Sequence, residues 1–156
     1  MKKAIIMAVT LVLISMISLS TYSQVSGSME DLVKNKGYKF LAQSANPSRG
    51  GLRQLDPGYE VIITKDSLQS YLPYFGRTYN APLDPSQSGI QFTSTDYEYT
   101  VKDRKKGGWD VQVKPKDYKD VRILQFSIFD NGSASLIVTS NNRESISFNG
   151  RIEERK

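Results

Sequence analysis

The stretch Val121–Ser140 reads VRILQFSIFDNGSASLIVTS, and it indicates the fold class more clearly than any other part of the chain. Val121–Phe129 is a long run of branched and aromatic residues, and residues 134–138 return with an apolar side chain at every second position. Asp130-Asn131-Gly132 stands between the two runs, and Asn-Gly favours a tight type I′ turn because both residues tolerate positive φ. The stretch therefore predicts an antiparallel β-hairpin.

The same period-two alternation continues on both sides of this hairpin. Downstream, Asn141-Asn142 predicts a turn into a last strand, Ile146–Ile152, and upstream the glycine-containing turn 105–108 separates the runs 97–101 and 109–113. Further alternating runs begin at Tyr38, Tyr59, Leu68 and Ile90. Because about eight or nine strands follow one another through short connections, the sequence predicts an all-β, mainly antiparallel meander. Closure into a barrel-like sheet or a two-sheet sandwich would hide the edges, and the pattern leaves both open.

One short helix is predicted near residues 29–36, before the first strand. Ser28 can cap it, Glu30 and Asp31 place negative charge in its first turn, and Gly37 is the expected stop. A helix this short needs tertiary packing for stability, so we expect it to lie across one end or face of the β-domain.

The N-terminus has the order of features of a secretory signal peptide. Met1-Lys2-Lys3 is positively charged, residues 4–19 are almost wholly apolar, and small and polar residues follow up to an expected cut between Ser23 and Gln24. The apolar run is short for a permanent span, which needs about 20 residues. We therefore expect a signal peptide at 1–23 and one exported, periplasmic or secreted, β-domain at 24–156.

Composition excludes several kinds of chemistry. The chain contains no histidine and no cysteine, which rules out Ser–His and Cys–His catalysis, the usual zinc sites, disulfides and a lipoprotein anchor. No cofactor or metal is expected. Loss of Lys2 and Lys3 with the signal lowers the formal charge from +5 to +3, a mild excess that does not indicate a nucleic-acid partner. A soluble monomer is expected.

The least ordinary segment runs from Tyr71 through Leu-Pro-Tyr-Phe-Gly-Arg to Tyr79. Its candidate ligand-binding residues are Tyr71, Tyr74, Phe75, Arg77 and Tyr79. They form either an aromatic lip, with arginine binding a carboxylate or a sugar acid, or a structural plug in which Arg77 pairs with an internal carboxylate.

Two weaker candidates lie elsewhere. A basic hairpin carries Lys102, Arg104, Lys105 and Lys106, which could contact an anionic glycan or lipid headgroup or simply be solvated. Asp66-Ser67-Leu68 is similar to a short acceptor pattern for O-linked glycans, which makes Ser67 a candidate glycosylation site.

Several segments come in a familiar order: Tyr38–Phe40, Leu72–Arg77, Ser88–Phe92, Lys106–Trp109, Ser140–Arg143 and Ile146–Gly150. Together they resemble domain-of-unknown-function family 4251, exported envelope proteins of Bacteroides-type bacteria. The resemblance covers nearly all of the mature chain and implies an exported single β-domain without an assigned activity or catalytic residue. Many relatives carry a lipoprotein cysteine after the signal, which this chain lacks.

The sequence thus predicts a non-enzymatic exported β-domain that binds a small apolar or glycan-like ligand, or another envelope protein or lipid. The alternative is a structural or inhibitory interaction module that uses an exposed strand edge and has no pocket. A more remote alternative is a carboxylate-based hydrolase using Asp96, Glu98 or Asp110, which would need two of these groups flanking one cleft.

Overall fold

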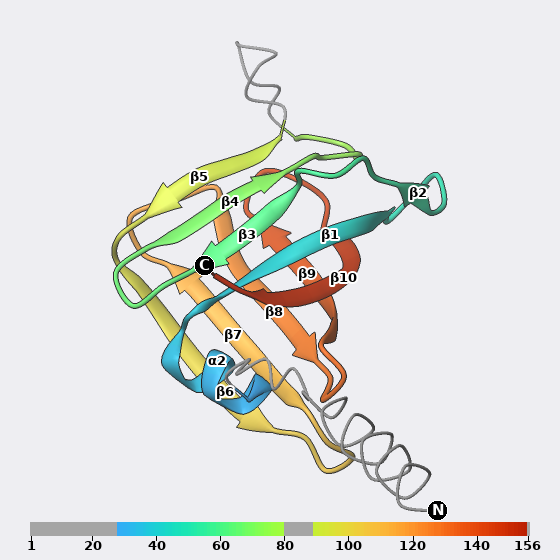
Figure 1. Cartoon of the computed structure of the whole chain (residues 1–156). Coiled ribbons are helices and arrows are strands. Elements are labelled where there is room, and N and C mark those ends of the chain that lie inside the picture. The colour runs from blue at the N-terminus through green and yellow to red at the C-terminus, as the bar shows by residue number, and fades with distance from the viewer. Residues whose placement is uncertain (1–27, 80–88, 156) are drawn as a thin grey trace, which may run out of the picture.

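The computed structural model describes residues 28–79 and 89–155 (Figure 1). The predicted signal peptide, residues 1–23, lies outside the described residues. The elements are α2 (Met29–Asn35), β1 (Tyr38–Pro47), β2 (Arg53–Gln54), β3 (Glu60–Ile63), β4 (Leu68–Leu72), β5 (Ile90–Ser94), β6 (Tyr97–Asp103), β7 (Trp109–Pro115), β8 (Val121–Ile128), β9 (Ser133–Ser140) and β10 (Ile146–Glu154). Nine strands pair in the order β5-β4-β3-β1-β10-β9-β8-β7-β6, with the short β2 added beside β1. The predicted antiparallel all-β fold with one short helix is confirmed.

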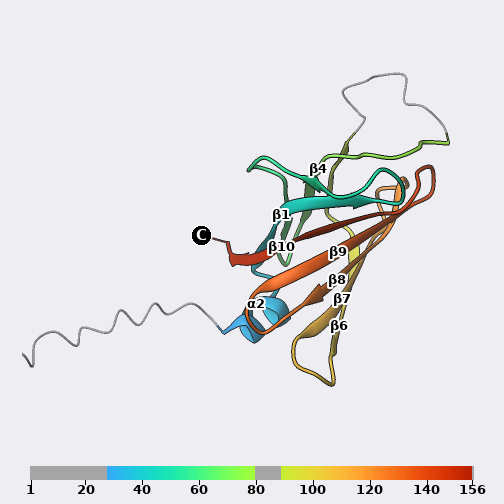
Figure 2. The ribbon, with the colours of Figure 1, turned by 90° about the vertical axis from the view of Figure 1, so that its right-hand side faces the viewer.

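The sheet is bent into a nearly closed barrel. Figure 2 shows β1 and β4 in one layer and β9, β8, β7 and β6 in the other, with β10 running between the layers. β5 and β6 are the two ends of the sheet, and no ladder joins them within the described residues. The link of two residues between them therefore turns a corner from one layer to the other (Figure 1).

The interior of the barrel is filled by side chains from the inward face of nearly every strand. Tyr38, Phe40, Phe126 and Phe148 are among the largest fully buried side chains. The rings of Phe40 and Phe126 meet edge to face, with centroids 5.7 Å apart at 72°. Packing of this kind holds the two layers together by burial of apolar surface, which at about 25 cal/mol per Å² is the main stabilising term.

The β1–β10 ladder is the place where the two layers meet, and Gly150 lies at its tightest point. Gly150 pairs with Ala42, directly before a β-bulge in β1 between Ala42 and Ser44. A Cβ on Gly150 would lie 1.9 Å from the carbonyl oxygen of Leu41. Glycine at this position lets the two backbones approach closely where β10 bends, a common use of strand glycines at barrel corners.

The β8–β9 hairpin is present, but its turn differs from the predicted type I′. Gly132 has φ of 81°, whereas Asn131 stays at negative φ. The N–H of Gly132 donates to the carbonyl of Phe129 at 2.9 Å, as in a three-residue loop with glycine in the left-handed region. The Asn131 Oδ1 accepts from the Ser133 N–H at 3.0 Å. Asn131 therefore stabilises the turn through its side-chain hydrogen bond and not by adopting a positive φ.

α2 begins at the predicted cap and ends one residue earlier than expected. The Ser28 Oγ accepts from the Asp31 N–H at 3.2 Å. Lys36, not Gly37, takes the left-handed conformation that stops the helix, with φ of 56°. The Lys36 ammonium lies 5.2 Å from the ring centroid of Tyr99, so a cation–π contact accompanies this lysine in a conformation that glycine usually adopts.

A tyrosine cluster joins α2 and β1 to the free end of the sheet at β6. The Tyr99 hydroxyl donates to the Val33 carbonyl at 2.7 Å and lies 3.1 Å from the Tyr38 hydroxyl. The Tyr97 hydroxyl donates to the Thr64 carbonyl after β3. These phenols thus connect β6 to α2, to β1 and to the end of β3.

We expect this cluster to make the fold sensitive to alkali. Burial raises the pKa of Tyr38 and of Tyr99 above the ordinary value of 10.0, because the phenolate would lose its hydration. The unfolded chain therefore ionises first, so the stability from these groups is complete below pH 10 and declines as the pH rises towards the folded pKa values. Tyr99→Phe should cost about 1–3 kcal/mol at neutral pH through lost hydrogen bonds and should flatten the decline above pH 10.

Urea unfolding at neutral and alkaline pH measures both effects. The exposed Tyr71 provides the matched control, since Tyr71→Phe should leave the unfolding curve unchanged at either pH. An equal alkaline decline in the parent and Tyr99→Phe would contradict the assignment to this cluster.

Candidate functional site

The predicted aromatic segment is held against the β9–β10 turn by its backbone and by Tyr74. The Tyr74 hydroxyl donates to the carbonyl of Arg77 at 2.8 Å and contacts that of Glu144 at 3.1 Å. Backbone N–H groups of Tyr79 and Glu144 donate to the carbonyls of Asn142 and Arg77, at 2.8 and 3.1 Å respectively. Tyr74 therefore fixes two distant segments to each other.

The other candidate residues of this segment do not converge on one pocket. Tyr71 points outward from β4 and stacks on Tyr59, with centroids 5.7 Å apart. Phe75 packs against the core and lies under the guanidinium of Arg53, 4.9 Å from its ring centroid. Arg77 and Tyr79 are exposed. These contacts favour the structural plug over the aromatic lip. Arg77, however, does not form the internal ion pair that the plug predicted for it.

Arg143 is the buried cation at this end of the barrel, and sequence reasoning missed it. Its Nε lies 3.2 Å from an Asp120 carboxylate oxygen, and its side chain is 8% exposed. Its Nη1 donates to the Gly89 carbonyl at 2.8 Å, and its guanidinium lies 5.2 Å from the Tyr74 ring centroid. Arg143 follows a turn between two strands, where an exposed arginine is the ordinary case, so only its place next to the conspicuous Asn-Asn pair could have drawn attention.

The basic hairpin divides into exposed and engaged residues. Lys105 and Lys106 are exposed at the β6–β7 turn, and Lys102 points outward from β6. Arg104 instead packs its guanidinium 4.8 Å from the Phe129 ring centroid and lies 3.5 Å from Asp110.

The candidate glycosylation site and the acidic residues have ordinary surroundings. Ser67 is half-buried in the β3–β4 turn, with its Oγ 3.0 Å from the Thr64 Oγ1. Asp96 and Glu98 both lie near Lys116, at 4.0 and 3.4 Å. Asp110 points to the same outer surface, and it lines a hollow in which neither Asp96 nor Glu98 takes part.

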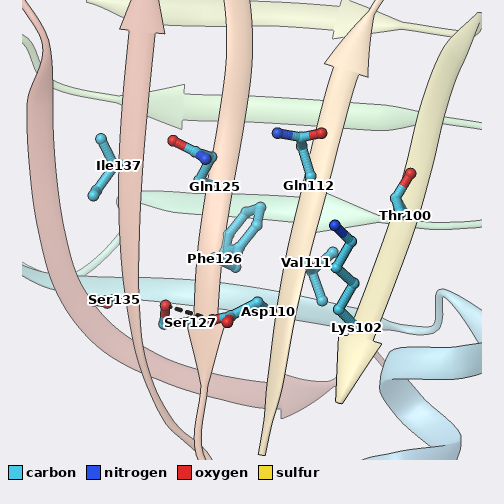
Figure 3. A pocket seen from close by; sticks show the side chains of 10 residues that line it. All are labelled: Thr100, Lys102, Asp110, Val111, Gln112, Gln125, Phe126, Ser127, Ser135 and Ile137. Atoms are coloured by element: carbon cyan, nitrogen blue, oxygen red, sulfur yellow. Dashed lines mark hydrogen bonds between the residues drawn. The ribbon is translucent and has the colours of Figure 1, made fainter. Parts of the chain in front are cut away.

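The outer face of β6, β7, β8 and β9 carries a groove of about 370 Å³ (Figure 3). The registers of the three ladders place its outward side chains in two rows across the sheet. One row is Thr100, Gln112, Gln125 and Ile137, and the other is Lys102, Asp110, Ser127 and Ser135. Strands stand about 4.8 Å apart, so each row presents a regular series of hydrogen-bonding groups.

The carboxylate of this groove is already engaged within the chain. The Asp110 carboxylate accepts from the Ser127 hydroxyl at 2.9 Å, and Arg104 lies 3.5 Å from it. Lys102 pairs in register with Asp110 across the β6–β7 ladder. The groups left for a ligand are mainly uncharged amides and hydroxyls, which both donate and accept hydrogen bonds.

A second hollow continues the groove beyond β9. It has a volume of about 460 Å³ and lies between the β1–β2 loop and the start of β10. Ile137 lines both hollows and is 45% exposed. An extended ligand lying across the strands would pass from one to the other over this apolar side chain.

The described residues define a class of protein: an antiparallel, barrel-like domain with a filled core and an external polar groove. Among residues 28–79 and 89–155, no cluster of acidic side chains could hold a metal ion. Nor does this part of the chain include a helix with the length and apolar character needed to cross a membrane.

The chain belongs to the family described as Domain of unknown function (DUF4251), whose model matches residues 23–152. The fold is similar to the crystal structure, at 1.95 Å, of a DUF4251 family protein from Bacteroides eggerthii DSM 20697. That match has a TM-score of 0.59 and 9% sequence identity, and it covers 81% of this chain and 85% of the other. A search of curated proteins finds no match. The family membership expected from the sequence is confirmed, and it assigns no activity.

Proposed function

We propose that the exported chain is a non-enzymatic module that binds neutral glycans in the outer groove over β6–β9. The observation that carries the proposal is the in-register row of Thr100, Gln112 and Gln125, which presents a hydroxyl and two amides along the floor of a hollow. Sugar hydroxyls donate and accept at once, and amides match both functions. The filled barrel interior supports an external site over an internal one.

The electrostatics of the groove favour neutral sugars over acidic ones. One cation and one anion line the groove, Lys102 and Asp110, so its lining carries no net formal charge. A polyanionic ligand would gain no net attraction from the groove itself. Binding should therefore depend little on salt concentration, because few charges are exchanged for counterions.

The proposal places the mature chain outside the cytoplasm, where such glycans occur. It rests on the signal-like N-terminus, and a secreted chain with Gln24 as its first residue would establish it.

The test is a titration of the mature chain with neutral oligosaccharides from chitin, mannan and glucan, followed by ¹H–¹⁵N NMR. Amide and side-chain signals of Gln112 and Gln125 are expected to shift on binding. The double variant Gln112→Ala/Gln125→Ala should weaken binding about tenfold, since it removes two hydrogen bonds worth about 0.5–1.5 kcal/mol each. Its stability should stay close to that of the parent, because both side chains point outward.

Gln91→Ala is the matched control, an exposed glutamine on β5 away from the groove. It should leave binding unchanged. Binding that survives the double variant, or that moves signals only in residues 71–79, would transfer the site to the aromatic segment. Equal response to acidic uronate oligosaccharides, abolished by salt, would instead point to Lys105 and Lys106.

A further inference from the structure

The outer edge of β6 is the free end of the sheet, and its backbone groups can be assigned a direction. The Arg104 N–H donates to the Gly108 carbonyl at 3.0 Å, and the Lys116 N–H donates to the Asp96 carbonyl at 2.8 Å. Hydrogen-bonded pairs alternate along an antiparallel ladder, so the even-numbered residues of β6 bond to β7. The N–H and C=O groups of Tyr97, Tyr99, Val101 and Asp103 therefore point away from β7. Within the described residues, no strand pairs with that edge.

This edge has a sequence that is complementary to itself. If two copies pair antiparallel about Thr100, Glu98 of one copy stands opposite Lys102 of the other, and Asp96 stands opposite Arg104. All these side chains belong to pairs that are not hydrogen-bonded, in which cross-strand side chains come closest. The same register places Tyr99 and Val101 opposite each other in hydrogen-bonded pairs. Wherever two charged side chains stand opposite each other they differ in sign, Asp103 stands opposite Tyr97, and Thr100 meets its own copy on the axis.

The pattern also continues the charges already present inside one copy. Glu98 pairs in register with Lys114, and Lys102 pairs with Asp110. Across the junction, the row would read Lys114, Glu98, then Lys102 and Asp110 of the partner subunit, with alternating signs throughout. A two-fold axis requires this kind of self-complementary patch, and a sheet edge supplies the main-chain bonds.

We infer that the β6 edge is an interface with a second copy of this chain, forming a continuous sheet through two barrels. About eight main-chain hydrogen bonds would join the copies, from the four outward-facing residues of each β6. The row of Gln125, Gln112 and Thr100 would then run across the axis into the same row of the partner subunit. The inference stands without the proposed glycan function, and it differs from the monomer expected from sequence alone.

Charge exchange provides the first test, read by sedimentation velocity at up to about 0.5 mM protein. The parent is expected to dimerise, and Glu98→Lys and Lys102→Glu should each be monomeric, since each places like charges opposite each other. An equimolar mixture of the two variants should dimerise again, because every pair is then opposite in sign. A monomeric parent throughout this range, or dimers that neither variant disturbs, would overturn the inference.

A cross-link provides the second test, in a chain that has no cysteine of its own. Thr100→Cys should form a disulfide between two copies under mild oxidation, since the two Cα atoms would lie about 4.5 Å apart, within disulfide range. Gln112→Cys is the control one strand further in, about 14 Å from its copy at the strand spacing of a sheet. Equal cross-linking of both variants would indicate random collision and would overturn the register.

Discussion

Gly150→Val is expected to prevent residues 24–156 from folding, with loss of the cooperative urea transition and of the near-ultraviolet signal of the buried aromatic rings. A side chain at this position meets the Leu41 carbonyl at 1.9 Å and the ring of Phe40 at 3.1 Å. Backbone cannot move aside as a flexible side chain can, and this ladder joins the two layers of the barrel. Overpacking that side chains can absorb costs about 1–3 kcal/mol, and a clash with backbone costs more, enough to exhaust a stability at the low end of the usual range of about 5–15 kcal/mol.

Gly150→Ala should show the same effect in a milder form, as a large fall in the urea midpoint. Gly37→Ala is the matched control, because nothing lies within 4 Å of its added Cβ and its φ is not positive. It should leave stability unchanged or raise it by about 0.4–1 kcal/mol, because alanine lowers the conformational entropy of the unfolded chain. A Gly150→Val variant with a midpoint close to the parent would show that the β1–β10 corner is not held as described.

Arg143→Ala is expected to lower the free energy of unfolding by about 3–5 kcal/mol, the cost of removing one partner from a buried ion pair. The change would leave Asp120, 20% exposed, without its guanidinium and the Gly89 carbonyl without that donor. It would also remove the cation above the Tyr74 ring. The measurement is urea unfolding at neutral pH with salt held constant.

Arg77→Ala is the matched control for Arg143→Ala, because it removes an arginine that has no buried ion pair. Arg77 is exposed, so its removal should change stability by no more than about 0.5 kcal/mol. Asp120→Asn combined with Arg143→Ala should recover part of the loss, since no unpaired buried charge then remains. Equal effects from the two single arginine variants would contradict the assignment of Arg143 as the buried cation.

The strands were predictable because their alternation follows from burial on one face. Residues 109–113 and 134–138 alternate as expected, with the apolar side chain at every second position inside, and Ile137 is the apolar exception on the outer face. What alternation does not specify is the order of strands, since the β1–β10 pairing joins residues at opposite ends of the chain. The two-residue β2 carries too little pattern to detect, and it pairs only through two residues of β1.

The site was less predictable, and the reasons are physical. Unusual composition drew attention to Tyr74 and Phe75, but aromatic side chains beside a proline pack at the end of a barrel as readily as they line a pocket. The groove is made of Thr100, Gln112 and Gln125, which look like ordinary solvent-facing residues when each strand is considered alone. Only the register of three ladders brings them into one row, and register is set by tertiary packing.

The missing ladder between β5 and β6 also bears on the order in which the chain can assemble. A circular permutant opened at Thr95-Asp96 would keep every ladder, and Tyr38 already pairs with Glu154 where the old ends would be joined. Its strands would follow one another as neighbours from end to end, a topology of low contact order. In the native order, by contrast, the central β1–β10 ladder must wait until β10 has been synthesised, and such non-local pairing is slow. A nascent chain that cannot close its sheet early remains unfolded for longer, which would suit the proposed export.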